Sequence, residues 1–417
     1  MEAVAEPPPL PTQHRPAPVD AAGRIHALDA VRGVALLGIF LMNIEWFTRP
    51  AQQMGSGVDP AATGIDRMAA LAVYVFVQGK FWVLFALLFG MGFALMSART
   101  GQGAGFRRIQ LRRYLALLGF GLAHALALFD GDILHAYAIA GLMLLALDGI
   151  PRRAWPWLGA GLYVTVATAV VLYGLLLASP VLAEPLAEMA SAMDETAAAA
   201  AQAFAHGDWW QAAAQRARDF ATITLPALAT VLPLALGVFM LGAWLYRSGR
   251  MDDVVAHRRW FVRLAAWTLP PGAALMAASL AVGTSFDGMR EAGPMTLALG
   301  LLTLASLPLA LGYLSLLALA LGTRALARPL LWLAPAGRMA LTHYLLQSLV
   351  AGLVFHGYGL GLWGQLGRAG QVGLVLVVFA LQVVASHWWL SRWRFGPMEW
   401  LWRAISYGSF PPMRRVH

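Results

Sequence analysis

The chain has no cysteine, and this absence excludes disulfides, thiolate metal sites and cysteine nucleophiles. Charged residues are also scarce, at 12% of the 417 residues, against 59% that are hydrophobic. Soluble domains carry about 25% charged residues. Many of the apolar residues stand in runs of about 20, the length at which a helix crosses a bilayer with its backbone hydrogen bonds satisfied internally. The composition therefore excludes a soluble fold and predicts an integral membrane protein.

Sequence signatures of several other functions are missing as well. No histidines stand in the His-Glu-x-x-His spacing, and no Gly-rich loop ends in a phosphate-binding lysine. The net charge of +9 comes from short arginine clusters between apolar runs, not from a long basic arm. We therefore expect no metal cofactor, no nucleotide motor and no nucleic-acid partner, and we expect the lipid bilayer as the main partner.

Ten apolar segments predict an all-α polytopic membrane bundle of about ten transmembrane helices. The segments are 31–47, 68–97, 111–129, 133–148, 155–179, 222–247, 260–282, 294–321, 337–356 and 370–391. Arginines follow every even-numbered segment, whereas the opposite loops are acidic or contain few charges. Because basic residues accumulate in short cytoplasmic loops, this asymmetry predicts that both termini are cytoplasmic.

The same pattern divides the chain into five parts. They are a Pro- and Ala-rich disordered cytoplasmic tail at 1–23, a membrane half of five helices at 24–179, a periplasmic loop at 180–221, a second membrane half of five helices at 222–407 and a cytoplasmic tail at 408–417. In the loop, an Ala-rich stretch favours a helix, and Trp209 and Trp210 suit a membrane interface. We expect an amphipathic cap on the outer surface, with a substrate-gating lid as the alternative.

The first segment carries ionisable side chains, which are costly in hydrocarbon and therefore candidates for function. Asp29 and Arg32 are three residues apart and share a helix face, so they can neutralise each other. The two residues form either a purely structural ion pair or part of a site. Asn43 and Glu45 lie near the outer end of the same segment.

Lys80 is the only lysine, and it lies in the second apolar segment, which is too long for one straight crossing. Gly79 therefore predicts a break in the helix just before Lys80. Such a break places Lys80 at the outer boundary of the membrane. There it either snorkels to the interface or takes part in chemistry.

His124 is the most promising ionisable residue within a segment. It follows Arg113 by 11 residues, about 16 Å of helical rise, and so lies past the bilayer midplane toward the outside. The acidic hairpin of Asp130, Gly131 and Asp132 follows within two turns and can orient the histidine ring. Asp132 is also placed to cap the next helix. His124 is either a core histidine bonded to a neighbouring helix or a functional base.

The last two segments carry further polar side chains in their inner halves. These residues are His343, Tyr344 and Gln347 in the ninth segment and Gln382 and His387 in the tenth. They either line a polar cleft or bond one helix to the other, and we favour helix packing.

Four groups of residues together form a specific pattern. They are Leu28, Asp29, Arg32, Gly33, Ala35, Leu36 and Asn43; Gly79, Lys80, Phe81, Leu84, Phe85, Leu88, Phe89, Gly90 and Gly92; His124, Gly131, Asp132, Ile133, Leu134, Tyr137 and Ala138; and Gly337, Arg338, Met339, Ala340, Leu341, Thr342, Tyr344, Gln347, Ser348, Gly359, Leu360, Gly361, Gly396, Pro397, Glu399, Trp400, Trp402 and Arg403. On this pattern the chain, from Leu28 to Tyr407, resembles the YeiB-like family of bacterial polytopic membrane proteins. His343 departs from it, since asparagine is usual there.

This family is placed near the transmembrane acyltransferases, and the opening at Asp29, Arg32 and Gly33 is similar to that of membrane O-acyltransferases. Those enzymes have a histidine 11 residues after the arginine, where this chain has Asn43, as the heparan glucosaminide acetyltransferases do. The resemblance implies an inner-membrane protein that moves an acyl group from a cytoplasmic acyl-CoA, such as acetyl-CoA. The acceptor would be a small molecule or a glycan on the periplasmic side.

Under this hypothesis His124 is the base, Asp132 orients it, and Asn43 or Lys80 steadies the developing oxyanion. The donor phosphates would be bound by arginines, although topology alone also explains most of these. The arginines are Arg32, Arg107, Arg108, Arg112, Arg113 and Arg338. Two alternatives are a transporter or flippase of a small anionic or amphipathic solute and a structural or sensory membrane component.

Overall fold

The computed structural model describes residues 26–101, 103–251 and 253–415. Over these ranges the chain is helical and forms no β-strand, which confirms the all-α prediction. The predicted tail at 1–23 lies outside the described residues. The helices are α1 His26–Asn43, α2 Gly64–Phe76, α3 Lys80–Thr100, α4 Ala104–Ala127, α5 Leu134–Ala146, α6 Trp155–Leu177, α7 Ala183–His206, α8 Trp209–Asp219, α9 Leu225–Arg247, α10 Arg258–Val282, α11 Ala292–Leu321, α12 Arg324–Trp332, α13 Ala334–Arg338, α14 Ala340–Phe355, α15 Arg368–Arg392 and α16 Pro397–Tyr407.

The described helices support a multi-pass membrane protein. Seven helical stretches within the described ranges are long and apolar enough to cross a membrane: His26–Phe47, Gly64–Thr100, Arg152–Leu177, Trp209–Arg247, Arg258–Val282, Gly288–Leu321 and Arg368–Arg392. The shorter apolar helices Leu134–Gly149 and Ala340–Phe355 coincide with two more of the predicted segments. The remaining predicted segment coincides with α4, which carries four arginines in its first half. Ten crossings therefore stay a prediction, although every predicted segment contains a helix.

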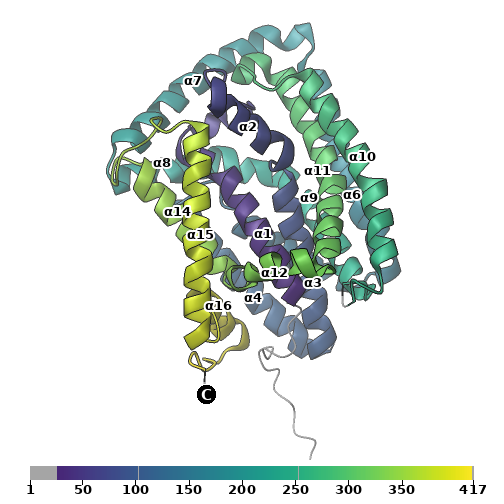
Figure 1. The fold of residues 1–417 in the computed structure, drawn as a ribbon. Coiled ribbons are helices and arrows are strands. Elements are labelled where there is room, and N and C mark those ends of the chain that lie inside the picture. Colours follow the sequence, from purple (N-terminus) through teal and green to yellow (C-terminus); the bar gives the residue numbers. More distant parts are fainter. Residues whose placement is uncertain (1–25, 102, 252, 416–417) are drawn as a thin grey trace, which may run out of the picture.

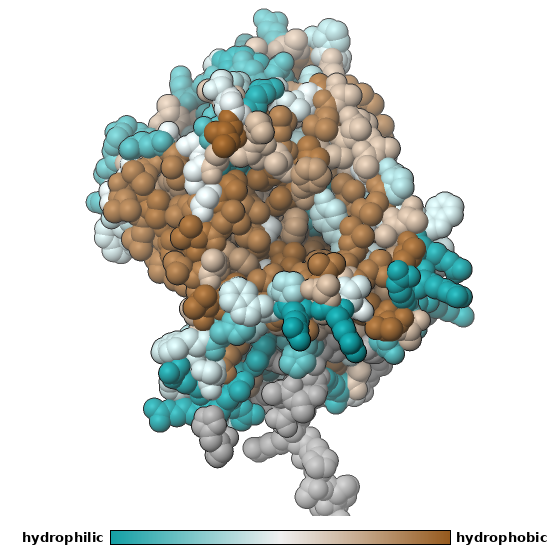
Figure 2. Space-filling model, in the orientation of Figure 1, coloured by the Kyte–Doolittle hydropathy of each residue, from teal (hydrophilic) through white to brown (hydrophobic). Residues whose placement is uncertain are grey.

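The bundle has two distinct ends (Figure 1). At the terminal end lie the start of α1 and the C-terminal helix α16; at the loop end lie α2 and α7. Figure 2 shows a band of hydrophobic side chains between hydrophilic residues at the two ends, as expected for a protein in a bilayer. At the loop end, α7 and α8 form an arch over the bundle, so the predicted cap is helical.

Two backbone features position the helices around the centre of the bundle. Gly79 has φ +81° and separates α2 from α3, so the predicted break is present. Helix α13 packs directly on α1, because Gly33 and Gly337 have no side chain to keep the backbones apart. A Cβ on Gly337 would collide with the carbonyl oxygen of Asp29. This contact holds Arg338, the last residue of α13, close to the start of α1.

Candidate active site

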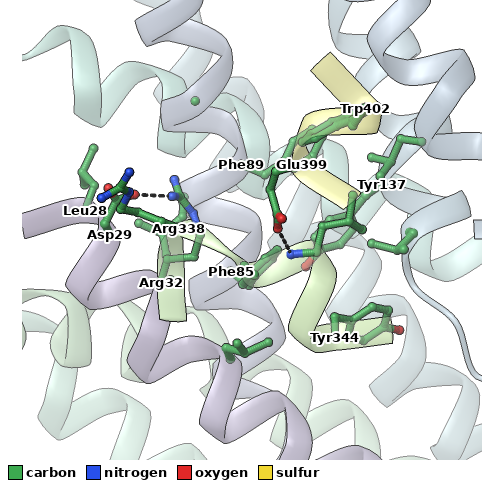
Figure 3. A pocket seen from close by; sticks show the side chains of 18 of the residues that line it. Leu28, Asp29, Arg32, Phe85, Phe89, Tyr137, Arg338, Tyr344, Glu399 and Trp402 are labelled. Atoms are coloured by element: carbon green, nitrogen blue, oxygen red, sulfur yellow. Dashed lines mark hydrogen bonds and ion pairs between the residues drawn. The ribbon is translucent and has the colours of Figure 1, made fainter. Parts of the chain in front are cut away.

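A cavity of about 230 Å³ lies among α1, α3, α4, α5, α13, α14 and α16, between the terminal end and the middle of the bundle. One end is lined by Asp29 and four arginines, Arg32, Arg113, Arg338 and Arg403. The rest is mostly apolar, with lining residues that include Leu36, Ile39, Phe85, Leu88, Phe89, Leu95, Met96, Leu117 and Tyr137. Figure 3 shows Asp29, Arg32 and Arg338 together on one side of the cavity and Tyr137 and Tyr344 on the other. The cavity therefore suits an amphipathic molecule with an anionic head.

Salt bridges and ring contacts hold the arginine end in place. Arg32 Nη1 lies 2.6 Å from Asp29 Oδ1, so the expected pair forms across one turn of α1. The Arg113 guanidinium lies 3.7 Å from the centre of the Trp402 ring, and Trp402 Nε1 donates to the Arg113 carbonyl at 2.8 Å. Of the six arginines predicted to bind a donor, three line the cavity. The other three, Arg107, Arg108 and Arg112, are exposed and lie outside the lining.

Helix α16 closes the cavity with residues that the sequence did not assign to a site. Glu399 Oε1 accepts hydrogen bonds from the backbone N–H of Leu341, at 2.7 Å, and of Thr342, at 3.1 Å; Oε2 accepts one from the Thr342 hydroxyl, at 2.6 Å. Burial raises the pKa of Glu399. Glu399 thus caps the first turn of α14, while Trp402 and Arg403 line the cavity. All three belong to the family pattern, which was the only signal for them in the sequence.

Behind the inner wall of the cavity lies a buried group of His124, Asp132 and His135, called here the His–Asp–His group. Asp132 Oδ1 lies 2.8 Å from His124 Nδ1, and Oδ2 lies 3.0 Å from His135 Nδ1. The backbone N–H of His135 also donates to Oδ2, at 3.0 Å, so Asp132 caps the start of α5 as predicted. None of the three residues is more than 3% exposed. Within the described ranges, no three such side chains are arranged to hold a metal ion.

The carboxylate fixes the protonation pattern of both rings. Burial acts to raise the pKa of Asp132, but the hydrogen bonds from His124 and His135 outweigh it, and the pKa lies below its ordinary value. An ionised carboxylate can only accept, so each Nδ1 carries a proton and each Nε2 is turned away from the carboxylate. Neither Nε2 has a hydrogen-bond partner in the described part of the chain. The group therefore presents two buried ring nitrogens without hydrogen-bond partners among the described residues.

Tyr344 connects this group to the cavity. It lines the cavity, its ring centre lies 5.0 Å from that of His124, and its hydroxyl donates to Asp132 Oδ1 at 3.3 Å. Ile133 and Leu134, which follow Asp132 directly, also line the cavity, whereas His124 itself does not. Gly121 on α4 permits the close packing, because a Cβ there would collide with the backbone nitrogen of His135.

Two residues predicted to steady an oxyanion lie elsewhere. Lys80 is fully buried and does not snorkel, because α2 folds back over it at Gly79. Its Nζ donates to the Tyr74 carbonyl at 3.1 Å and to Met276 Sδ at 3.3 Å, and it lines no part of the cavity. Asn43 ends α1, is half-buried and makes no side-chain hydrogen bond to any described residue.

The other polar candidates mostly join elements of the fold. Their contacts are His343 Nε2 to Ser386 Oγ at 2.6 Å, Gln347 Nε2 to Gln382 Oε1 at 3.0 Å, exposed His387 Nε2 to the Trp332 carbonyl at 2.9 Å, and Glu45 to Arg49 at 2.7 Å and to Arg368 at 3.5 Å. His343, Gln347 and Gln382 thus bond α14 to α15, as expected for helix packing. Tyr344, on the same helix, faces the cavity instead.

Comparisons with known proteins identify relatives along almost the whole chain. Residues 245–409 match the family described as "Protein of unknown function (DUF418)". The "Uncharacterized protein YxaH" of Bacillus subtilis (strain 168) is 31% identical over 94% of this chain and 96% of its own. The "Uncharacterized protein YeiB" of Escherichia coli (strain K12) is also 31% identical, over 92% and 97% respectively. No solved structure matches the chain. Because the printed names of these relatives assign no reaction, a function for this chain has to be argued from the geometry of its site.

Proposed function

Because the chain belongs to the YeiB-like family of membrane proteins with a DUF418 domain, and because its cavity leads from four arginines to Tyr344, which bonds the His–Asp–His group, we propose that it is a membrane acyltransferase. The donor is an acyl-CoA that enters from the cytoplasm, and the terminal end of the bundle faces that side. The acceptor is a small molecule or a glycan that approaches from the periplasmic loop end.

The shape and lining of the cavity support an acyl-CoA donor. Arg113, Arg338 and Arg403 lie where they can bind phosphate groups through charge-assisted hydrogen bonds. The lining residues on α3 run from Phe85 to Met96, about 16 Å of helical rise, so the cavity is elongated along the bundle. A thioester arm that follows this path from the arginines reaches Tyr344.

The chemistry follows from the bonding of the His–Asp–His group. His124 Nε2 takes the proton from an acceptor hydroxyl, whose oxygen attacks the thioester carbonyl carbon. The C–S bond breaks, and the leaving CoA thiolate takes the proton from His124. Asp132 holds the ring with Nε2 free throughout. Lys80 and Asn43 do not line the cavity, so neither takes the oxyanion role; Tyr344, which does line it, donates to Asp132 and helps to hold the carboxylate that orients His124.

The proposal can be tested with a substitution that fills the cavity and leaves its wall residues in place. Gly92 lines the cavity, and a Cβ there would have no described atom within 4 Å, so Gly92→Leu places its side chain in open space. Gly119→Leu is the matched control, because Gly119 also has open space but lies on the exposed face of α4. Acetyl-CoA and CoA should raise the unfolding temperature of wild type and Gly119→Leu but not of Gly92→Leu. Equal stabilisation of all three proteins would overturn the proposal.

A transporter of a small anionic or amphipathic solute is the second candidate. It is favoured by one observation: half-buried arginines line the cavity, and the buried Arg216 lies beyond the His–Asp–His group. Proteoliposomes separate the two candidates. A transporter accumulates unmodified labelled solute inside the vesicle, whereas an acyltransferase moves the acyl label to a new molecule.

A further inference from the structure

A second polar cluster lies on the loop-end side of the His–Asp–His group, outside the cavity. Its centre is Arg216 on α8, a residue with 0% exposure. Arg216 Nε donates to the carbonyl of Leu126 at 3.4 Å, and the guanidinium carbon lies 5.9 Å from the centre of the Tyr358 ring. Nη1 and Nη2 have no hydrogen-bond partner among the described residues. The two-pronged face of the guanidinium therefore holds no carboxylate of a described residue, and the Tyr358 hydroxyl is the polar group nearby.

Neighbouring carboxylates do not pair with this cation. No salt bridge joins Arg216 to an acid in the described part of the chain. Asp219 Oδ1 accepts instead from Gln52, at 2.8 Å, and Gln215, at 2.9 Å. Burial and the nearby Asp219 raise the pKa of Asp130 to about 7, so near neutral pH Asp130 supplies only part of a counter-charge. A buried guanidinium without a fixed partner destabilises a fold, and such costs persist where function requires them.

The position of Arg216 links it to the proposed base. Leu126, which accepts its hydrogen bond, is two residues from His124 on α4. Phe129 packs edge-on against His124 at 5.8 Å, Phe47 stacks on Phe129 at 5.1 Å, and His356 stacks on Phe47 at 5.7 Å. A row of buried, packed aromatic rings thus connects His124 with His356 on the loop-end side.

One contact of the arch with the bundle is a small apolar cluster. Ala200, Phe204 and Ala212 pack there against Tyr358 and Trp363. A short π-helix, Phe220–Thr224, joins α8 to α9, and π-helical turns often mark functional segments. Local opening of the arch at this cluster would give a ligand from the loop end a route to Arg216.

We propose that Arg216 binds the acidic group of the acceptor, a carboxylate or a phosphate, and so holds the acceptor hydroxyl at His124. This inference rests on the proposed acyl transfer and adds the chemical class of the acceptor. The guanidinium fork matches both oxyanions through two parallel hydrogen bonds. The donor and the acceptor then approach the His–Asp–His group from opposite ends of the bundle.

The experiment measures unfolding temperatures of the full-length protein in detergent with inorganic phosphate, D-glucuronate or uncharged D-glucose. Wild type should be stabilised by phosphate or glucuronate, and the more effective of the two identifies the acidic group; glucose should have no effect. Arg216→Met should unfold at the same or a higher temperature without ligand and lose the anion response. Arg218→Met, an exposed neighbour on α8, should keep it.

Two results would overturn the assignment of Arg216. The first is a large fall in the unfolding temperature of both Arg216→Met and the charge-preserving Arg216→Lys, with no anion response in wild type, since Arg216 would then be structural. The second is an anion response that survives in Arg216→Met. Stabilisation by CoA is measured in parallel and should persist in Arg216→Met. If CoA stabilises no variant while the anion response still depends on Arg216, the acyl-transfer proposal fails and the anion site stands.

Discussion

Replacing Asp132 by asparagine separates catalysis from stability at the centre of the proposed site. The carboxylate accepts hydrogen bonds from His124, His135 and Tyr344, including one backbone N–H. Asparagine has nearly the same shape but only one acceptor oxygen, and its NH₂ group would face a histidine Nδ1–H. Either that contact is lost, or one ring changes tautomer and its Nε2 becomes protonated.

The lost hydrogen bond sets the expected loss of stability, and the changed tautomer sets the expected loss of turnover. An unsatisfied buried donor costs about 1–3 kcal/mol, so the unfolding free energy of Asp132→Asn should fall by no more than about that amount. A base held in the wrong tautomer loses far more, and turnover should fall by about 10³–10⁴-fold. The assay follows CoA release from acetyl-CoA with a thiol-reactive dye in the presence of a cell-envelope fraction. The protein itself adds no dye signal, because it has no cysteine, and a reaction without the protein measures the thiols of the envelope fraction.

The pH dependence of stability gives an independent check. The folded pKa of Asp132 lies below its ordinary value, so its contribution to stability is complete above the unfolded pKa, about 3.9, and is lost as pH falls through the folded value. Below about pH 4 wild type should therefore lose stability faster than Asp132→Asn. Unchanged turnover in a stable Asp132→Asn protein would refute the role of the His–Asp–His group.

Two further predictions concern the ion pair and the orientation. Asp29→Asn and Arg32→Gln should each destabilise the protein, and the double variant should lose less stability than the sum of the two single losses, with a coupling energy of about 1–2 kcal/mol. Additive effects in the double-mutant cycle would contradict the pairing. A cysteine introduced at Ser191 should react with an impermeant reagent in intact spheroplasts and one at Gly103 should not; the reverse pattern would invert the topology.

Patterns of apolar residues predicted the helices well, because every apolar run contains at least one helix and backbone bonding leaves little other choice in a bilayer. Short spacings also carried information: eight residues separate His124 from Asp132, and the two meet across the α4–α5 turn. Directions of side chains across helices were not predictable. Tyr344 and His343 are neighbours in sequence, yet one faces the cavity and the other bonds to α15.

The residues that were missed depend on tertiary packing. Lys80 was expected at the boundary, but the turn at Gly79 buries it under α2, which no local pattern indicates. Arg216 belongs to a segment read as a surface cap, and only the packing of the arch on the bundle reveals that its guanidinium is enclosed. Glu399 was visible only as part of a family pattern without a physical role.

Both halves of the chain line the cavity, but the proposed base comes from the first half alone, and this division affects how function can be transferred between relatives. Arg338, Tyr344 and Glu399 belong to the second half, whereas Asp132 and its histidines belong to the first. A fragment or relative that contains only the C-terminal domain would carry helix α16, which closes the cavity, and part of the cavity wall, but it would lack the proposed base. Shared ancestry over that domain alone is therefore insufficient grounds for assigning the same chemistry. Complementation between separately expressed halves offers a genetic route to study each one.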